Sequence, residues 1–238
     1  MNTLTKEETI QFSRQIKLAE IGIEGQEKIK AANVLVIGAG GLGCPILLYL
    51  SSAGVGTIGI IDFDKVEIHN LHRQILFSIE DLGKQKSIVA KNKLQQQFPN
   101  IHYKVFDERL NKFNCEEIIS QFDLVVDGSD NFPTRYLIND TCVRLNKTLV
   151  YGSILDFEGQ FAIFNFKGSK NLRDLFPEPP DPKDIPGCDE NGVLATLPAI
   201  IGSIIAQETL KLIIGMAILE NQLTIFNTKK MTFDTISF

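Results

Sequence analysis

Cysteine pairs, an excess of positive charge and an uninterrupted apolar run are all missing from this 238-residue sequence. The four cysteines, Cys44, Cys115, Cys142 and Cys188, form no C-x-x-C pair, which argues against a structural zinc site and a disulfide framework. The net charge of −5 argues against nonspecific binding of DNA or RNA, because such binding needs a positive face that displaces counterions.

The longest apolar stretch, residues 192–215, is interrupted by Pro198, Gln207, Glu208 and Lys211. These residues favour a buried helix over a membrane span. The first twenty residues have a polar, helical pattern without the apolar core of a signal peptide. We therefore expect a cytoplasmic protein that binds neither a membrane nor nucleic acid.

Strand-like apolar runs at residues 34–38, 57–62, 101–106 and 122–127 alternate with helical stretches. This alternation predicts a parallel sheet built from βαβ units, with a further strand at residues 148–152. Residues 158–166 and 222–236 have the pattern of antiparallel strands. We expect an α/β fold: a Rossmann-like, mainly parallel sheet with helices on both faces, extended by C-terminal antiparallel strands. Residues 167–192 concentrate Pro, Gly and Asp, which predicts a long irregular loop with a functional role.

A glycine-rich turn follows the first predicted strand and contains Gly38, Gly40, Gly41 and Gly43 in the sequence GAGGLG. The G-x-G-x-x-G spacing permits a tight turn and lets backbone N–H groups and a helix N-terminus approach phosphate oxygens. The turn therefore predicts phosphate binding. It does not choose between a dinucleotide oxidoreductase and an ATP-using enzyme, and a chance match is a third interpretation.

Polar residues after the second predicted strand favour ATP. Asp62 lies about twenty residues beyond the glycines, where a carboxylate commonly accepts the ribose hydroxyls of either nucleotide. Four further residues follow this strand or open the next helix: Asn70, Arg73, Gln74 and Lys86. The positive charge among them suits a triphosphate, which is more negative than a pyrophosphate. The alternatives are a solvated Lys86 and an Arg73 that pairs with Glu80 or Asp81.

The fourth predicted strand ends in DGSDN, which places Asp127 and Asp130 at the edge where open α/β sheets bind ligands. Mg²⁺ favours one or two carboxylates together with phosphate oxygens and water. Asp130 opposite a triphosphate is therefore the predicted Mg²⁺ ligand. The pair Asp130 and Asn131 is also a good helix N-cap, and the two roles are compatible.

Six motifs in order resemble those of the ThiF/MoeB/HesA family, the bacterial relatives of ubiquitin-activating enzymes. They are RQI (14–16), GAGGLG (38–43), DFD (62–64), NLHRQ (70–74), GKQK (83–86) and DGSDN (127–131). The resemblance covers residues 14–215 and selects ATP, used for adenylation. It implies one ThiF-type adenylation domain over residues 1–238: N-terminal helices at 1–32, a nucleotide-binding half at 33–152, and carrier-binding strands, a crossing loop and a C-terminal helix at 153–238.

The family adenylates the C-terminal glycine of a small ubiquitin-like sulfur carrier protein and releases pyrophosphate. Carried over by motif, the implied nucleotide-binding residues are Gly38, Gly40, Gly41, Gly43, Asp62, Asp64, Asn70, Arg73, Gln74, Lys86, Asp130 and Asn131. The implied catalytic residues are Arg14, Arg73, Lys86, Asp130 and Cys188. In the family, the residue matching Arg14 reaches into the partner subunit's site, which implies a homodimer. The resemblance adds a cysteine desulfurase or a rhodanese as a sulfur donor. No residue selects among the thiamine, molybdopterin, cysteine and siderophore pathways.

Two departures from the family pattern concern cysteine. Many members bind structural zinc through two C-x-x-C pairs, but residues 171–174 read NLRD, so we expect no zinc and compensation by packing of the phenylalanine-bearing strands. Cys188 falls where sulfur-transferring relatives carry a cysteine that forms a covalent link with the carrier. Asp189 and Glu190 beside it oppose thiolate formation, so an unreactive loop thiol is the alternative.

Two other classes of function stay open. An NAD-dependent oxidoreductase would share the glycine turn and Asp62, but it would leave Arg14, Arg73, Lys86 and Asp130 without roles. A non-catalytic module that binds ubiquitin-like proteins would keep the fold without the reaction.

Overall fold

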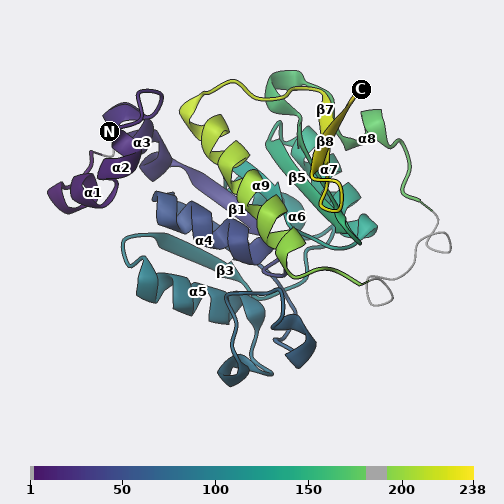
Figure 1. The fold of residues 1–238 in the computed structure, drawn as a ribbon, viewed down its shortest axis with the longest axis horizontal. Coiled ribbons are helices and arrows are strands. Elements are labelled where there is room, and N and C mark those ends of the chain that lie inside the picture. Colours follow the sequence, from purple (N-terminus) through teal and green to yellow (C-terminus); the bar gives the residue numbers. More distant parts are fainter. Residues whose placement is uncertain (1–2, 181–191) are drawn as a thin grey trace.

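The computed structural model describes residues 3–180 and 192–238. Within these ranges, eight strands form one sheet in the spatial order β3-β2-β1-β4-β5-β6-β7-β8 (Figure 1). The strands are β1 (Asn33–Ile37), β2 (Thr57–Ile61), β3 (His102–Phe106), β4 (Leu124–Asp127), β5 (Thr148–Leu155), β6 (Glu158–Phe164), β7 (Gln222–Asn227) and β8 (Thr232–Ser237).

The sheet is mixed: β3, β2, β1, β4 and β5 pair in parallel, and β5 to β8 pair antiparallel. This confirms the predicted fold class. The parallel strands β1 and β2 are apolar and buried over nearly their whole length, because helices cover both faces. The chain runs from β1 outward to β2 and β3, then returns to β4 on the other side of β1. Ligands of open α/β sheets bind at such a reversal of strand order.

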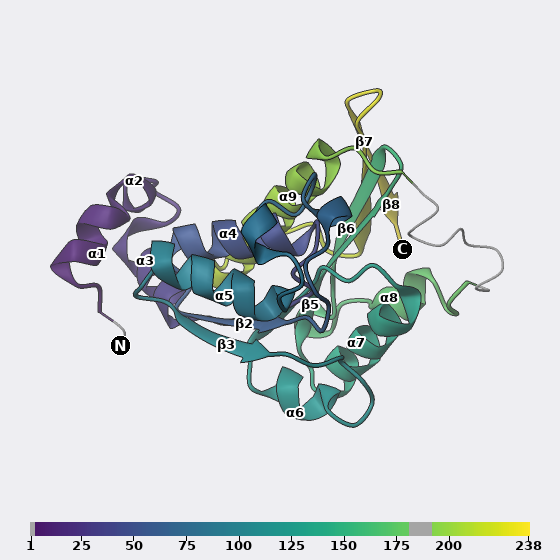
Figure 2. The ribbon, with the colours of Figure 1, turned by 90° about the horizontal axis from the view of Figure 1, so that it is seen from below.

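Helices on the two faces enclose two apolar cores. One face carries α3 (Gly22–Ala31), α4 (Gly43–Ala53), α5 (Lys86–Gln97) and α9 (Thr196–Ile214), and the other carries α6 (Cys115–Ser120), α7 (Phe132–Arg144) and α8 (Leu172–Leu175). Figure 2 shows α4 and α5 on one side of the sheet and α6 and α7 on the other. Alternate residues of β1 serve the two cores: Val34 and Val36 face the first, and Leu35 and Ile37 face the second.

The segment predicted to be irregular contains a short helix. The structure describes residues 167–180 and 192 of this segment. Part of it lies in the turn η3 (Phe166–Gly168) and part in α8, so the expectation of no regular structure is wrong there. Asn171 accepts a hydrogen bond from the backbone N–H of Arg173 at 2.9 Å, and Asp174 accepts one from that of Asn171 at 2.8 Å. This reciprocal capping begins the helix.

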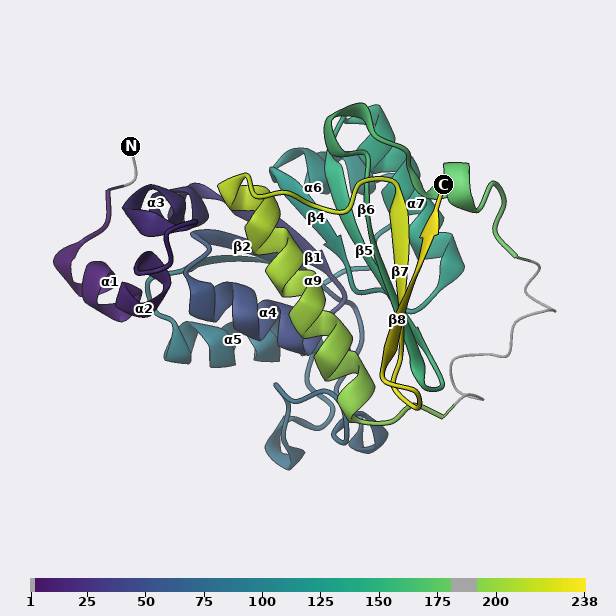
Figure 3. The same ribbon diagram turned by 45° about the horizontal axis from the view of Figure 1, so that its top comes forward.

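Helix α9 crosses the sheet next to α4 and over β5 and β6 (Figure 3). By length and composition it could cross a membrane, but 44% of its apolar window is buried inside the protein. Two strand glycines allow it to lie close to the sheet, since a Cβ on Gly152 or Gly159 would lie 2.2 Å from Ile205 or Ile201. The packing is that of a core helix.

The N-terminal helices α1 (Lys6–Gln11), α2 (Ser13–Ile16) and α3 lie at one end of the molecule (Figure 1). The side chains of Gln15 and Gln26 both donate to the carbonyl oxygen of Ala53, at 3.1 and 2.9 Å. Ala53 ends α4, near the amino ends of the parallel strands. These helices are therefore anchored at the edge opposite the carboxyl ends of β1 and β4.

Candidate active site

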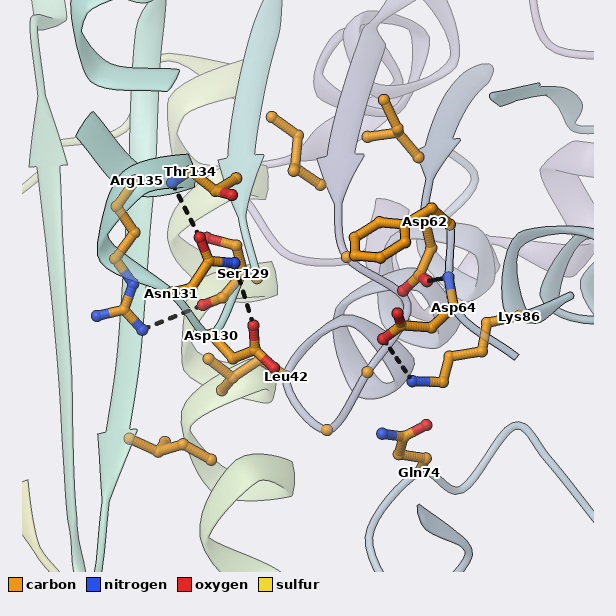
Figure 4. Close-up of a pocket in the computed structure, with 18 of the residues that line it drawn as sticks. Leu42, Asp62, Asp64, Gln74, Lys86, Ser129, Asp130, Asn131, Thr134 and Arg135 are labelled. Atoms are coloured by element: carbon orange, nitrogen blue, oxygen red, sulfur yellow. Dashed lines mark hydrogen bonds and ion pairs between the residues drawn. The ribbon is translucent and has the colours of Figure 1, made fainter. Parts of the chain in front are cut away.

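A cavity of about 210 Å³ lies at the carboxyl ends of β1, β2 and β4. Figure 4 shows Asp62, Asp64 and Lys86 on one side of it and the segment from Ser129 to Arg135 on the other. The wall also includes Ile37, Gly38, Gly40, Gly41, Leu42, Phe63, Arg73, Gln74, Glu108, Arg109, Leu110, Ile154, Leu155, Asp156, Gly192 and Val193. The cavity therefore occupies the point where the strand order reverses.

The glycine turn forms the floor of this cavity and has no room for side chains at two positions. Gly38 has φ +92°, and a Cβ there would lie 2.9 Å from the carbonyl oxygen of Gly128. A Cβ on Gly43 would lie 1.9 Å from the carbonyl oxygen of Gly38. The turn therefore folds tightly onto the start of α4. The N-terminus of α4 begins at Leu42 on the cavity wall, and a helix N-terminus beside a cavity favours an anion there.

Asp62 ties the end of β2 to the glycine turn. Its carboxylate accepts hydrogen bonds from the backbone N–H groups of Ala39 at 2.7 Å and Asp64 at 2.8 Å. Burial raises the pKa of Asp62, and these two hydrogen bonds oppose the increase. Each carboxylate oxygen retains a lone pair, so Asp62 can still accept a hydroxyl from the cavity.

Lys86 opens α5 and turns into the cavity wall, where its Nζ lies 3.1 Å from the carboxylate of Asp64. Only 5% of Lys86 is exposed, so the solvated alternative is wrong. Gln74 is equally enclosed, and its Oε1 has no hydrogen-bond partner in the described residues. A buried ammonium group and this amide oxygen thus lie at the same cavity.

Arg73 also lines the cavity, and its Nη1 donates to the carbonyl oxygen of His69 at 3.1 Å. Among the described residues Arg73 forms an ion pair with neither Glu80 nor Asp81, and Asp81 is paired with Lys93. The alternative of a pairing with Glu80 or Asp81 is therefore wrong, and Arg73 remains a lining residue of the cavity. Asn70 lies outside the lining: it is buried and its Oδ1 accepts from the backbone N–H of Glu67 at 3.0 Å, which holds the turn η1 (Ile68–Asn70).

Asp127 at the end of β4 and Asp130 in the turn 128–131 lie in different environments. Asp127 is fully buried, and burial raises its pKa while the charge of Arg135 opposes the increase. Asp130 is exposed and lines the cavity. Asn131, not Asp130, caps α7, because its Oδ1 accepts from the backbone N–H of Thr134 at 3.0 Å. Asn131 therefore caps the helix, and both Asn131 and Asp130 line the cavity.

Several lining residues were not anticipated from the sequence. Arg109 lies over the ring of Phe63, with its guanidinium carbon 5.0 Å from the centroid, just beyond Asp62. Arg135 is 6% exposed and lies on the buried face of α7. A signal existed for it, since Arg135, Ile138 and Cys142 are spaced as one helix face.

Unpaired buried polar atoms gather at this site. Within residues 3–180 and 192–238, buried side-chain atoms without a hydrogen-bond partner include Gln74 Oε1, Asp127 Oδ2, Ser129 Oγ and Arg135 Nε. Each such atom costs about 1–3 kcal/mol if it stays unpaired. In native proteins such atoms call for an explanation, and a ligand, an ion or water bound in the cavity would provide one.

A search of protein families matches residues 12–238 to the ThiF family. The chain belongs to the ThiF family. It is 48% identical over 217 residues to a sulfur carrier protein adenylyltransferase of Thermus thermophilus, a match that covers 89% of this chain and 80% of the relative. It is 46% identical to the adenylyltransferase and sulfurtransferase MOCS3 of Culex quinquefasciatus, over 97% of this chain and 53% of the relative. A probable adenylyltransferase/sulfurtransferase MoeZ of Mycobacterium tuberculosis is 42% identical, over 99% and 62%.

This ThiF family chain therefore spans little more than half the length of the MOCS3 and MoeZ relatives. Among solved structures, PaaA aligns with a TM-score of 0.84 at 22% identity, over 100% of this chain and 75% of that one. E. coli MccB with succinimide aligns with a TM-score of 0.83 at 21% identity, over 95% and 71%. These likenesses show the fold.

Two residues that the ThiF family resemblance assigned to catalysis are not among the described residues of the cavity wall. Arg14 is exposed on α2, at the opposite edge of the sheet from the glycine turn. Cys188 lies outside the described residues. The cavity of one chain therefore brings together Arg73, Lys86 and Asp130 of the assigned catalytic set.

The segment where many ThiF family members carry a zinc-binding cysteine pair is held here by charge. Arg173 of α8 binds the carboxylate of Asp140 on α7 with two hydrogen bonds of 2.7 and 2.9 Å. Its guanidinium also lies over the ring of Tyr136, 4.9 Å from the centroid. Compensation by packing of the phenylalanine-bearing strands stays a prediction, and at α8 the link to α7 is a bidentate ion pair.

The carboxylates at the cavity suit a metal that is shared with phosphate. No group of three or more His, Cys, Asp or Glu side chains that could hold a metal occurs in the described part of the chain. Mg²⁺ does not need such a group, because it takes one or two carboxylates and completes its shell with phosphate oxygens and water. Asp130, on the wall opposite Lys86, meets this requirement (Figure 4).

Proposed function

We propose that this chain adenylates the C-terminal glycine of a small ubiquitin-like sulfur carrier protein, with ATP as the second substrate and pyrophosphate as a product. The observation that carries the proposal is the cavity itself. A glycine turn at a helix N-terminus, a buried lysine and an exposed aspartate face one space, in a family whose named relatives are adenylyltransferases. The positive groups suit a triphosphate.

In the proposed reaction, a carboxylate oxygen of the carrier's C-terminus attacks the α-phosphorus of ATP. A new P–O bond forms to the carrier, and the bond between the α-phosphorus and the bridging oxygen breaks to release pyrophosphate. The carboxylate is already ionised at neutral pH, so no general base is needed. The chain's contribution is alignment and neutralisation of charge.

The residues divide this work by position. The glycine turn and the N-terminus of α4 receive phosphate oxygens, and Asp62 receives the ribose hydroxyls. Lys86 and Arg73 face the negative charge that develops on the leaving pyrophosphate. Lys86 must exchange its contact with Asp64 for one with phosphate. Asp130 would hold Mg²⁺, which supplies additional positive charge to the phosphates.

The carrier would approach along the C-terminal half. Leu155 is 56% exposed and Phe157 37% exposed at the hairpin between β5 and β6, and Leu155, Asp156 and Val193 line the cavity. Exposed apolar side chains beside a cavity are typical of a protein-docking surface. These residues would guide the carrier's tail toward the α-phosphate.

The finer features of the proposal concern assembly and sulfur. We infer a cytoplasmic homodimer in which Arg14 of one subunit enters its partner's cavity, supported by the distance of α2 from the cavity of its own chain. Zinc is not part of the proposed enzyme. Sulfur transfer through Cys188, with a cysteine desulfurase or a rhodanese as donor, would follow adenylation.

Exchange of labelled pyrophosphate into ATP tests the proposal, because only a reversible adenylation step produces it. The wild-type chain should catalyse exchange in the presence of Mg²⁺ and a carrier with a Gly-Gly C-terminus, and not with a carrier lacking those glycines. Asp130→Ala should lose at least about 100-fold in rate, as expected for a lost metal ligand. Glu116→Ala, which removes an exposed carboxylate from α6, is the matched control. Exchange at the wild-type rate in Asp130→Ala would remove Asp130 from the mechanism, and absence of exchange with every carrier would refute the function.

A further inference from the structure

A single buried guanidinium connects the 128–131 turn to the neighbouring strand. Arg135 donates from Nη2 to the backbone carbonyl oxygen of Ser129 at 3.1 Å. From Nη1 it donates to Ser153 Oγ at 2.8 Å and to Tyr151 Oη at 3.2 Å. One side chain of α7 thus joins the turn after β4 to two residues of β5.

The environment of this guanidinium fixes its orientation. Its carbon lies 5.3 Å from the ring centroid of Phe132 and 5.5 Å from that of Tyr151. Only 6% of Arg135 is exposed. A planar group between rings, with three acceptors at its edges, has little freedom to rotate. A lysine ammonium is a point charge and cannot reproduce this fork.

The contact with Ser129 matters because of its place in the turn. The backbone N–H of Ser129 donates to the buried carboxylate of Asp127 at 2.8 Å, and Asn131 is held as the cap of α7. Asp130 lies between these fixed points. Arg135 binds the carbonyl oxygen of Ser129, the residue directly before Asp130. Loss of the Arg135 guanidinium would therefore free the turn on the side facing β5.

We propose that Arg135 is a positioning residue for adenylation: by fixing the 128–131 turn against β5, it sets the place of the Asp130 carboxylate at the cavity. The proposal rests on the function proposed above, in which Asp130 holds Mg²⁺. Figure 4 shows the arrangement, with Arg135 beside Ser129 and Asn131 on the side of the turn away from Lys86. Arg135 acts through Asp130, not on the reacting atoms.

The test compares Arg135→Lys with Ser153→Ala, which removes one acceptor of the fork and leaves every charge in place. Arg144→Lys is the matched control, since Arg144 lies on the same helix and pairs with the exposed Glu116. Two experiments are made: titration calorimetry gives the Mg²⁺ dependence of ATP binding, and carrier-dependent pyrophosphate exchange gives kcat and KM. Melting temperatures show whether each variant folds.

Mutation of a residue that positions a metal ligand typically lowers metal affinity or activity by about 10- to 100-fold. Arg135→Lys should therefore raise the Mg²⁺ concentration for half-maximal ATP binding by about 10-fold and lower kcat, with the carrier KM unchanged. Ser153→Ala should shift both in the same direction by a smaller factor, and Arg144→Lys should match wild type.

Wild-type Mg²⁺ dependence in a folded Arg135→Lys or Ser153→Ala variant would overturn the proposal. So would an increase in carrier KM alone, which would mean that Arg135 contacts the carrier directly. The function proposed above fails separately, if the wild-type chain shows no carrier-dependent exchange. In that event the calorimetric titration still decides whether Arg135 positions Asp130, because it needs only Mg²⁺ and ATP.

Discussion

Three glycines of one turn provide a graded test of how closely the chain packs around the cavity. A Cβ added to Gly40 would meet only Gln74 Nε2, at 3.6 Å, which is an ordinary contact. A Cβ on Gly41 would lie 3.3 Å from Pro198, which requires a small adjustment. A Cβ on Gly43 would lie 1.9 Å from the carbonyl oxygen of Gly38, which no adjustment of a side chain can relieve.

Because none of these three glycines has φ in the left-handed region, the alanine series measures space and not backbone strain. Overpacking typically costs about 1–3 kcal/mol, and more when backbone atoms collide. For a chain of this size, 1 kcal/mol lowers the melting temperature by about 2–4 °C. We expect Gly43→Ala to melt about 6–12 °C below wild type, Gly41→Ala about 0–4 °C below, and Gly40→Ala at the wild-type temperature.

Melting curves by circular dichroism measure the change in stability, and titration calorimetry with Mg²⁺ measures the change in ATP binding. Gly40→Ala should fold normally yet bind ATP more weakly, since a methyl group would hinder the approach of phosphate to the backbone N–H groups. Gly168→Ala is the contrasting variant outside the cavity: with φ +84° and no atom within 4 Å of its Cβ, it should lower the melting temperature through backbone strain and leave ATP binding unchanged. Equal melting temperatures for Gly43→Ala and Gly40→Ala would refute the close packing of the turn against the start of α4.

Two further predictions concern subunits and pH. If the cavity is shared, chains with Arg14→Ala and chains with Asp130→Ala should be inactive alone and regain about a quarter of wild-type exchange when mixed equally, since one site in each heterodimer is intact; continued inactivity after proven subunit exchange would contradict it. The hydrogen bonds from Arg173 hold the pKa of Asp140 below its ordinary value of 3.8. The resulting stabilisation is therefore present above pH 3.8 and lost as the pH falls through the lowered pKa. The difference in urea stability between wild type and Asp140→Asn should narrow below pH 3.8, and a constant difference would exclude this linkage.

Much of the fold follows from short sequence patterns because the sheet is built locally. The apolar runs that became β1, β2 and β4 are each bounded by polar turns, and burial on both faces leaves little ambiguity about such runs. The glycine turn and Asp62 were predicted at the cavity for the same reason: both follow a strand directly. Position relative to a strand end is a local property that the sequence shows.

The residues that the sequence left open, misplaced or missed depend on which partner each polar side chain meets in the folded chain. Lys86 looks like a solvated helix residue until Asp64, 22 residues earlier, is placed beside it. Arg135 finds its acceptors on β5, up to 18 residues later. Asn70 is polar and follows β2, but its amide closes a local turn. A single sequence does not show which of these polar groups turns inward.

The glycine turn also shows why the cavity depends on the whole fold. Three elements distant in sequence press on it: the end of β4 at Gly128, the end of β2 at Asp62, and the first turn of α9 at Pro198. Since none of these contacts forms without the assembled sheet, the turn is organised only in the folded chain. A ligand that binds the organised turn and not the unfolded chain stabilises the folded state by mass action. Pro198 in the first turn of α9 belongs to residues 153–238, the half that would bind the carrier. The contact between Pro198 and Gly41 therefore connects the proposed nucleotide site with the proposed carrier site.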